Sequence, residues 1–492
     1  MFDYDATPPI KPVEDGDRHY SNPTIWVGVA PNTLTAATAF DATKGIRAFL
    51  NGLNVTDIDI AYRETVPESL VSPALFTPVS IVDHHREFID PVSVALSLPI
   101  AGLKTTMQGT VGPYFRVENK LYAITVRHNL FVAGAGNDEF RHNSAFSPLT
   151  PRQLQDLSHS APPPDSAPKV QVVLMGNRAF ANYLASIQAH IRTLIDTVDA
   201  IEKKIKTITS KVQNGIGLPQ SQIDLDNNVA ERDRLRAKVN VLKAFFGDIK
   251  ERWGKITQRI IGHVVWAPPI GVGVAPHQYT RDLCVVELDK ARFLNLLGNV
   301  LSLGAVLVLS HGMRRSELHL GPEYNSTKLK ELLHERDNVQ STFKYPDDGL
   351  LTLRNILSAE QISNPDTKNL EGDPIRRALK RGFATNTTVG TISRFMSFVR
   401  KYFLTGNLES IELPILPHEK ETGTFSKGGD SGSIIVSPKG EFISLLTSGT
   451  NKGTDGSDIT YSTAFEWIWE LVRGEFPGAN LYFDDIAAFL AA

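Results

Sequence analysis

A seven-residue apolar repeat constrains the fold of this 492-residue chain more than any other feature. From residue 184 to residue 212, apolar side chains recur at alternating steps of three and four, which is typical of a helix that packs along one side against another helix. They are Leu184, Ile187, Ile191, Leu194, Val198, Ile201, Ile205, Ile208 and Val212. After the turn 214-NGIGLPQSQ, the same stepping returns at Leu235, Val239, Leu242, Phe246, Ile249, Trp253, Ile256 and Ile260. The pattern predicts an antiparallel coiled-coil hairpin over residues 180–260.

The chain on either side of this hairpin has a β texture. Short apolar segments separated by glycine begin near residue 93, and similar segments return at 261-IGHVVWAPP, 388-TVGTISRF and 441-EFISLLTSG. Strands of this length with turns between them predict a closed barrel or a sandwich. We therefore expect a mainly β domain over residues 93–475 that carries the hairpin as an insertion.

The two ends of the chain differ from this domain. Residues 1–22 are acidic and Pro-rich and are expected to form a disordered arm. A strand, helix, strand pattern from 24-TIWVGVAP to 57-DIDIAYRE predicts a small α/β domain over residues 23–75. Residues 476–492 are expected to be a C-terminal tail.

Composition narrows the class of protein. The formal net charge is -3 and 41% of residues are hydrophobic, so an ordinary globular protein is expected, with neither nucleic acid nor membrane as its partner. The start of the sequence lacks an apolar signal segment, and a single cysteine, Cys284, excludes an intrachain disulfide. These features predict an intracellular, reducing compartment.

The stretch 426-SKGGDSGSIIVS is the strongest candidate for a chemical site. Glycines on both sides of the Asp430–Ser431 pair allow a tight turn and a close approach of substrate to the main chain. Ser431 is a nucleophile only if a base and an orienting acid lie elsewhere in the chain. The alternative is a Gly-rich loop with a solvated aspartate.

Two apolar segments supply such partners. His128 ends 121-LYAITVRH, and Asp282 opens 282-DLCVVELD, so a base at a strand end and an acid entering a buried strand are both present. The alternatives are a structural histidine and a strand-capping acid, and Asp289 is a rival for the orienting acid. The pair His84-His85 lacks a third ligand, so neither a metal nor a cofactor is expected.

The chain resembles the trypsin-like, chymotrypsin-fold serine peptidases, in particular a disulfide-free intracellular branch. The family's Thr-Ala-x-His motif is similar to 125-TVRH, its Asp-(Ile/Leu)-Ala-(Leu/Val) motif to 282-DLCV, and its Gly-Asp-Ser-Gly motif is matched at residues 429–432. The hairpin before the nucleophile resembles 380-KRGFATNTTVGTIS. The resemblance implies a double β-barrel with the helical hairpin inserted, and a serine endopeptidase acting on a peptide or protein substrate.

The resemblance also implies a role for individual residues. Ser431 would be the nucleophile, His128 the general base and acid, and Asp282 the residue that orients the imidazole. The backbone N–H groups of Gly429 and Ser431 would form the oxyanion hole. The substrate-binding residues would be Thr447, Ser448 and Gly449, which pair with an extended substrate, and Phe425, which would floor the specificity pocket.

One departure from the family pattern leaves alternatives open. No activation sequence of the Arg-Ile-Val-Gly-Gly type precedes the barrel, so Asp430 cannot pair with a newly formed N-terminus and must find another partner. The chain is therefore either an active peptidase or a catalytically silent scaffold that binds proteins. The hairpin is a candidate site for a protein partner or a spacer, and the N-terminal domain is a candidate inhibitory lid.

Overall fold

The computed structural model describes residues 10–11, 19–20, 24–29, 34–64, 73–79, 83, 85–132, 136–142, 169–216, 219–303, 346–365, 367–368, 372–403, 406–418, 423–450 and 459–492. The chain divides into two compact units, residues 1–71 and residues 72–492.

The first unit contains a small α/β element. Strands β3 (Thr24–Val29) and β4 (Asp59–Glu64) pair in parallel, and helix α1 (Ala36–Gly52) connects them. Thr35 caps this helix, since its hydroxyl accepts a hydrogen bond from the backbone N–H of Thr38. Of the arm expected at residues 1–22, the structure describes only β1 (Ile10–Lys11) and β2 (His19–Tyr20), which pair antiparallel.

The second unit begins with an antiparallel eight-stranded sheet. Its strands run in the order β6-β5-β10-β11-β14-β8-β7, with β9 paired to β11. Their side chains are mostly buried, which explains the apolar runs of the sequence. The strands are β5 (Pro99–Gly102), β6 (Gly109–Thr110), β7 (Tyr114–Val117), β8 (Lys120–Thr125), β9 (Phe140–Arg141), β10 (Gln171–Leu174), β11 (Ile260–Ala267) and β14 (Cys284–Leu288).

A second antiparallel sheet closes on itself. The order β18-β19-β21-β24-β23-β22 returns to β18 through the β18–β22 pairing, while β17 pairs with β18 and β20 with β21. Closure pairs each of these six strands with a neighbour on both sides over part of its length. The strands are β17 (Thr367–Lys368), β18 (Pro374–Gly382), β19 (Asn386–Ile392), β20 (Ser397–Phe403), β21 (Gly406–Pro417), β22 (Ile434–Val436), β23 (Phe442–Gly449) and β24 (Thr460–Ala464).

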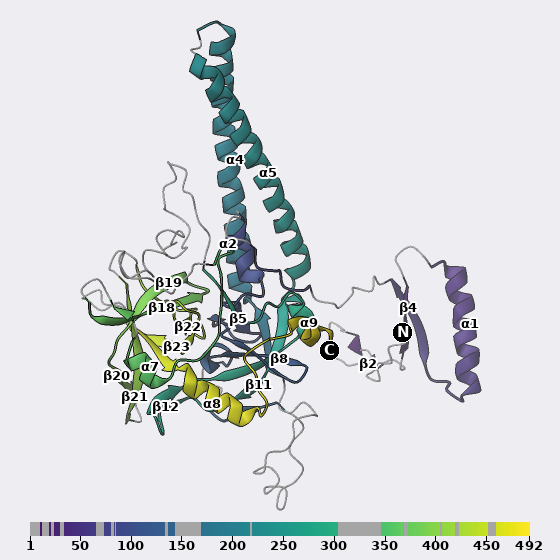
Figure 1. Ribbon diagram of the computed structural model, residues 1–492. Coiled ribbons are helices and arrows are strands. Elements are labelled where there is room, and N and C mark those ends of the chain that lie inside the picture. Colours follow the sequence, from purple (N-terminus) through teal and green to yellow (C-terminus); the bar gives the residue numbers. More distant parts are fainter. Residues whose placement is uncertain are drawn as a thin grey trace, which may run out of the picture. The chain divides into compact units, whose positions relative to one another are not determined.

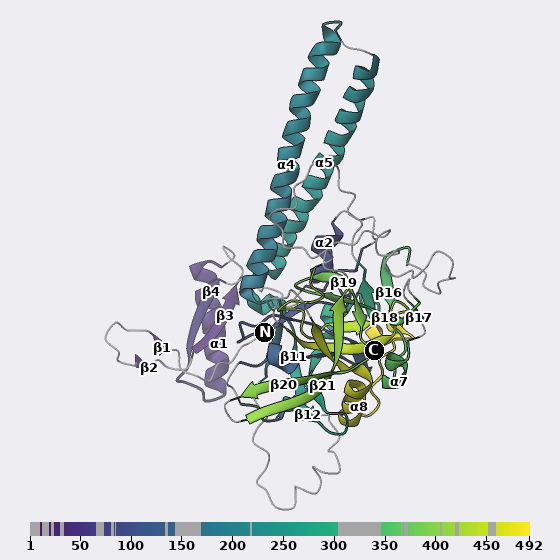
Figure 2. The same ribbon diagram turned by 90° about the vertical axis from the view of Figure 1, so that its left-hand side faces the viewer.

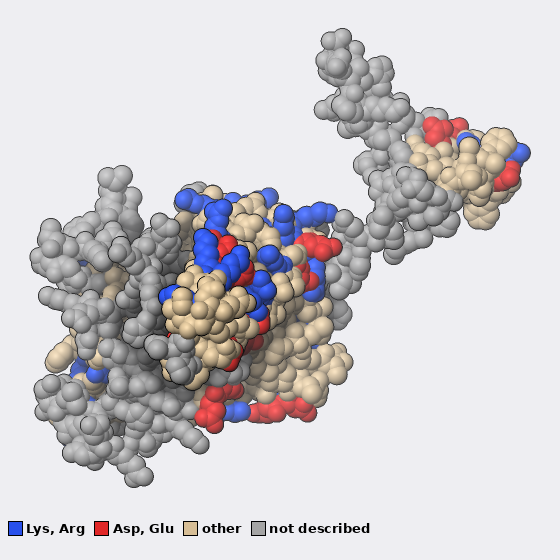
Figure 3. Space-filling model, turned by 90° about the horizontal axis from the view of Figure 1, so that it is seen from above, with Lys and Arg blue, Asp and Glu red and all other residues tan. Residues whose placement is uncertain are grey.

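Two long helices rise from the first sheet (Figures 1 and 2). Along the chain, helices α4 (Asn177–Gln213) and α5 (Pro219–Trp253) follow β10 and precede β11. These two strands are antiparallel neighbours in the sheet. The chain therefore leaves and re-enters the sheet at one place, as an inserted hairpin must. Seen from above, Lys and Arg side chains lie mainly in the upper part of the coloured surface, with a few Asp and Glu side chains between them (Figure 3).

The second helix of the hairpin ends earlier than the apolar repeat predicts. Helix α5 ends at Trp253, whereas Ile256 lies in the 3-10 helix η3 (Ile256–Arg259) and Ile260 opens β11. The buried Arg259 explains this end, because its Nη1 donates to the carbonyl oxygens of Trp253 at 2.8 Å and Gly254 at 2.9 Å. Carbonyl oxygens at the end of α5 thus accept hydrogen bonds from the Arg259 side chain and not from a further helical turn.

The remaining elements connect and cover the two sheets. The segment expected as a C-terminal tail packs on the core, with Leu481, Phe483 and Phe489 buried. Within the described residues, no helix is both long enough and apolar enough to cross a bilayer. The elements are α2 (Arg86–Ile89), η1 (Asp90–Val92), η2 (Arg127–Asn129), β12 (Gly271–Val274), β13 (Tyr279–Arg281), η4 (Lys290–Phe293), β15 (Val300–Ser302), β16 (Leu350–Thr352), α7 (Ala359–Ser363), α8 (Phe465–Glu475) and α9 (Ile486–Ala491).

Candidate active site

His128 and Asp282 meet at the end of two paired strands. In the β8–β14 register Thr125 lies opposite Cys284, so the residues after Thr125 face the residues before Cys284. His128 Nδ1 lies 2.5 Å from Asp282 Oδ2. The second carboxylate oxygen, Oδ1, accepts the backbone N–H groups of Arg127 at 2.7 Å and His128 at 3.2 Å. The antiparallel pairing thus brings two residues far apart in sequence into one hydrogen-bonded unit.

This unit holds the imidazole in one tautomer. A carboxylate only accepts hydrogen bonds, so His128 Nδ1 carries the proton and Nε2 is left to act as a base. Asp282 is only 5% exposed, while the His128 side chain keeps 30% of its surface exposed. Asp289, the alternative candidate for the orienting acid, does not contact His128. Its carboxylate caps η4 by accepting the N–H of Ala291 at 3.1 Å.

Ser431 is attached to the first sheet through its backbone. Its carbonyl oxygen accepts the N–H of Thr110 and the side-chain amide of Asn129, each at 2.9 Å. Asn129 directly follows His128, so its bond connects the Ser431 main chain to the residue next to His128. Among the described residues, none forms a hydrogen bond with the Ser431 hydroxyl, His128 included.

Two amide donors that flank Asp430 have no hydrogen-bond acceptor among the described residues. The N–H groups of Asp430, Gly432 and Ser433 donate to backbone carbonyls at 2.9–3.0 Å, whereas those of Gly429 and Ser431 donate to no described residue. Gly429 and Gly432 adopt φ values of +106° and +90°, which side chains rarely allow. The glycines of the sequence motif therefore produce a backbone shape in which the N–H groups of Gly429 and Ser431 are left unpaired.

Asp430 has partners that the sequence did not reveal. Its Oδ1 accepts the N–H groups of Ala384 at 2.8 Å and Thr385 at 3.2 Å, and its Oδ2 accepts the N–H of Lys427 at 2.9 Å. Lys380 Nζ lies 3.2 Å from the same Oδ2. The only sequence signal for this arrangement was the segment 380-KRGFATNTTVGTIS, whose lysine had no assigned role.

The residues expected to bind substrate lie on and behind strand β23. Thr447, Ser448 and Gly449 end this strand, and β24 pairs with it there, whereas its pairing with β22 stops at Leu445. One side of the strand end is thus unpaired among the described strands. Phe425 is 1% exposed, and its ring lies in the core.

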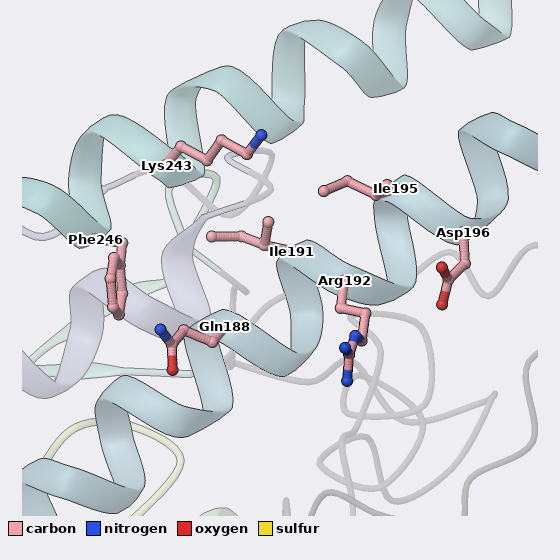
Figure 4. Close-up of a pocket in the computed structure, with 7 residues that line it drawn as sticks. All are labelled: Gln188, Ile191, Arg192, Ile195, Asp196, Lys243 and Phe246. Carbon is pink, nitrogen blue, oxygen red and sulfur yellow. The ribbon is translucent and has the colours of Figure 1, made fainter.

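A groove of about 420 Å³ lies on the helix pair, away from His128 (Figure 4). Ile191 and Phe246, both from the apolar stepping, contribute to its lining together with Lys243. Among the described residues, no three His, Cys, Asp or Glu side chains are arranged to hold a metal ion. His84 lies outside the described residues, and His85 Nδ1 lies 3.2 Å from Asp83 Oδ1.

The chain has low similarity to known proteins. No protein-family model and no curated protein matches the chain. Matching solved structures include Protease A of Thermobifida fusca (10% identity, 77% of this chain and 95% of that one, TM-score 0.29) and a Nocardiopsis protease (9%, 79%, 97%, 0.29). A glutamic acid specific serine protease also matches (8%, 78%, 97%, 0.27). Similarity this low carries no argument. The two antiparallel sheets, of which the second closes on itself, and the inserted helix pair make the fold mainly β and consistent with the predicted double barrel.

Proposed function

We propose that the chain is a serine endopeptidase that hydrolyses peptide bonds through an acyl-enzyme. The observation that carries the proposal is the contact of 2.5 Å between His128 Nδ1 and Asp282 Oδ2, beside a loop whose Gly429 and Ser431 N–H groups are free. A base of fixed tautomer, a hydroxyl and a pair of amide donors are the groups that acyl transfer requires.

Each group has one role in this mechanism. The Ser431 hydroxyl oxygen attacks the peptide carbonyl carbon while His128 Nε2 takes the hydroxyl proton, and the Gly429 and Ser431 N–H groups bind the resulting oxyanion. His128 then gives the proton to the leaving amine, which breaks the peptide bond. In deacylation the oxygen of a water molecule attacks the acyl carbon while His128 Nε2 takes a proton from that water. His128 then gives the proton to the Ser431 oxygen as the bond between Ser431 and the acyl group breaks. Asp282 stabilises the imidazolium formed in each step.

The substrate would be an extended peptide. The unpaired side of β23 at Thr447, Ser448 and Gly449 suits main-chain hydrogen bonds to a substrate strand. The single cysteine, which is buried in β14, fits activity in a reducing, intracellular compartment.

Labelling with a fluorophosphonate probe tests this function. We expect the wild type to be labelled, Ser431→Ala to be unlabelled, and kcat on a peptide substrate to fall by at least about 10³-fold in Ser431→Ala. Ser433→Ala is the matched control, because Ser433 is a fully buried serine of the same loop and its variant should still be labelled. An unlabelled wild type, or equal labelling of Ser431→Ala, would favour the silent scaffold.

A further inference from the structure

The two neighbours of the candidate base are buried polar residues. Arg127 and Asn129 lie on either side of His128 in the turn η2, and Asn129 is only 1% exposed. Part of the His128 side chain, by contrast, reaches solvent. A buried polar side chain is normally bonded to other groups of the protein, so the contacts of both neighbours show how the base is held.

Arg127 fixes the turn η2 against the first sheet. Its Nη1 donates to the carbonyl oxygens of Ala267 at 2.7 Å and Pro268 at 2.9 Å, where strand β11 ends. Hydrogen bonds from a charged donor are stronger than those from a neutral one. Because the guanidinium ties the turn to a paired strand, His128 and Asn129 keep a fixed position on this sheet.

Asn129 connects this fixed turn to the candidate nucleophile. Its Nδ2 donates to the carbonyl oxygen of Ser431 at 2.9 Å, although the two residues are 302 positions apart in the sequence. Only one peptide unit and one short side chain separate His128 from this hydrogen bond. A shift of the Asn129 amide would therefore change the distance between the base and the Ser431 main chain.

The Asn129 amide is not the side chain that packing alone would favour. Its Oδ1 is buried, and no described residue donates a hydrogen bond to it. A buried amide oxygen without a donor lowers stability, whereas an apolar side chain of similar shape would not. The site also requires a glycine at position 109, because a Cβ there would lie 1.8 Å from Asn129 Nδ2. Both observations indicate a residue that serves the bond to Ser431.

We infer that Asn129 is a positioning residue, which sets the spacing between His128 and Ser431 by holding the Ser431 carbonyl oxygen. This inference rests on the proposed peptidase function, in which the base and the hydroxyl must meet. The amide itself touches no reacting atom. Misplacing reacting groups by about 1 Å can slow a reaction by about 100-fold, so a single hydrogen bond is enough to affect the rate.

The first test compares Asn129→Leu with the wild type. Leucine branches at the same atom as asparagine, and it removes both the donor and the unpaired oxygen. We expect kcat on a peptide substrate to fall at least about 30-fold, with KM changed less than about threefold, because the spacing affects the chemical step. The melting temperature should stay within about 3 °C of the wild type or rise. A residue that served only stability would not lose activity in this way.

A second variant covers the case in which leucine does not fit beside Gly109. Asn129→Ala removes the amide and adds no atom, so its kcat should fall as in Asn129→Leu. Asn295→Ala is the matched control, because Asn295 Nδ2 likewise donates to one main-chain oxygen, that of Leu75 at 2.7 Å, outside the Ser431 loop. The kcat of this control should stay within about threefold of the wild type.

Amide hydrogen exchange at Thr110 provides a readout that does not need activity. The Thr110 N–H donates to the same Ser431 carbonyl oxygen at 2.9 Å. Once the Asn129 amide no longer holds that oxygen, this N–H should exchange at least about tenfold faster, whereas Asn295→Ala should leave its rate unchanged. A wild type that fluorophosphonate does not label would remove the peptidase function, and exchange at Thr110 would still decide whether Asn129 holds Ser431.

Several results would overturn the inference. One is a kcat within about threefold of the wild type in both Asn129→Leu and Asn129→Ala. Another is an equal loss of kcat in Asn295→Ala, and a third is unchanged exchange at Thr110 in Asn129→Ala. A melting temperature more than about 5 °C below that of the wild type in Asn129→Leu would show that Asn129 serves the stability of the fold instead.

Discussion

Single residues determine how closely the Ser431 loop approaches the first sheet. Asn129 Nδ2 donates to the Ser431 carbonyl oxygen at 2.9 Å, and a Cβ atom on Gly109 would lie 1.8 Å from that same nitrogen. Gly432 leaves similar room, since its Cβ would meet the Thr110 carbonyl oxygen at 2.3 Å. The two sides of the candidate site thus meet at glycines, at the Asn129 amide and at Thr110, whose hydroxyl donates to the Gly429 carbonyl oxygen at 2.8 Å, so a Cβ atom at Gly109 or Gly432 would push them apart.

Replacing Gly432 by alanine tests this close approach. The new Cβ would clash with the Thr110 carbonyl oxygen and would sit on a residue with a φ of +90°. We expect Gly432→Ala to lower the free energy of unfolding by about 2–4 kcal/mol and to slow fluorophosphonate labelling at least tenfold. Gly428→Ala is the control, because no atom lies within 4 Å of a Cβ there. Equal melting temperatures for the two variants would contradict the prediction.

Two buried arginines hold the helix pair to the first sheet. Arg259 Nη2 donates to Asn177 Oδ1 at 2.7 Å, at the start of α4, while its Nη1 caps the end of α5. Arg292 Nη2 donates to the carbonyl oxygens of Gln258 at 2.6 Å and Ile260 at 2.7 Å. Both helix ends at the barrel are thus fixed by charged groups bonded to backbone oxygens, which suits a rigid base.

The packing between the helices can be tested at adjacent positions of α5. Leu242 is fully buried and Val241 is 52% exposed. We expect Leu242→Ala to cost about 2–4 kcal/mol in urea unfolding, from lost burial and an unfilled cavity, and Val241→Ala to cost less than about 0.5 kcal/mol. Labelling of Ser431 should be unaffected by either change. Similar unfolding midpoints would mean that the apolar stepping does not form a packed interface.

For the whole molecule, local patterns were easier to predict than contacts between distant segments. The mainly β double barrel with a long helix pair was predicted and is confirmed, because strand and heptad periodicities are local signals. Ile256 and Ile260 continue the apolar stepping but lie outside α5, since Arg259 caps the helix at Trp253.

The candidate site could be predicted only in part, because some of its residues depend on contacts between distant segments. Three short motifs pointed to the segments that meet there, because each motif is contiguous in the chain. The Lys380–Asp430 pair, by contrast, depends on the β18–β22 pairing that closes the second barrel. Asn129 likewise was not a candidate residue, because its bond to Ser431 exists only once the Ser431 loop meets the first sheet.

Stability against acid is a property of the whole fold to which His190 should contribute. His190, on α4, packs its ring 5.2 Å from that of Phe88 on α2, and burial lowers the pKa of His190 to about 4, with Lys238 and His85 adding to the shift. Glu87 Oε1 is 3.9 Å from His190 Nδ1, too far for a hydrogen bond that would favour the charged form.

The sign of the effect follows from proton binding. Between pH 6.5 and about 4 the unfolded chain binds more protons at this residue than the folded chain, so stability falls as the pH drops through this window. We expect the loss of unfolding free energy between pH 7.5 and 4.5 to be smaller in His190→Gln by about 1–2 kcal/mol, discounted for the partial exposure of the ring. Urea unfolding of both proteins at several pH values measures this difference. Parallel pH curves would show that His190 does not link the helix pair to acid stability, because removing its titration would then change nothing.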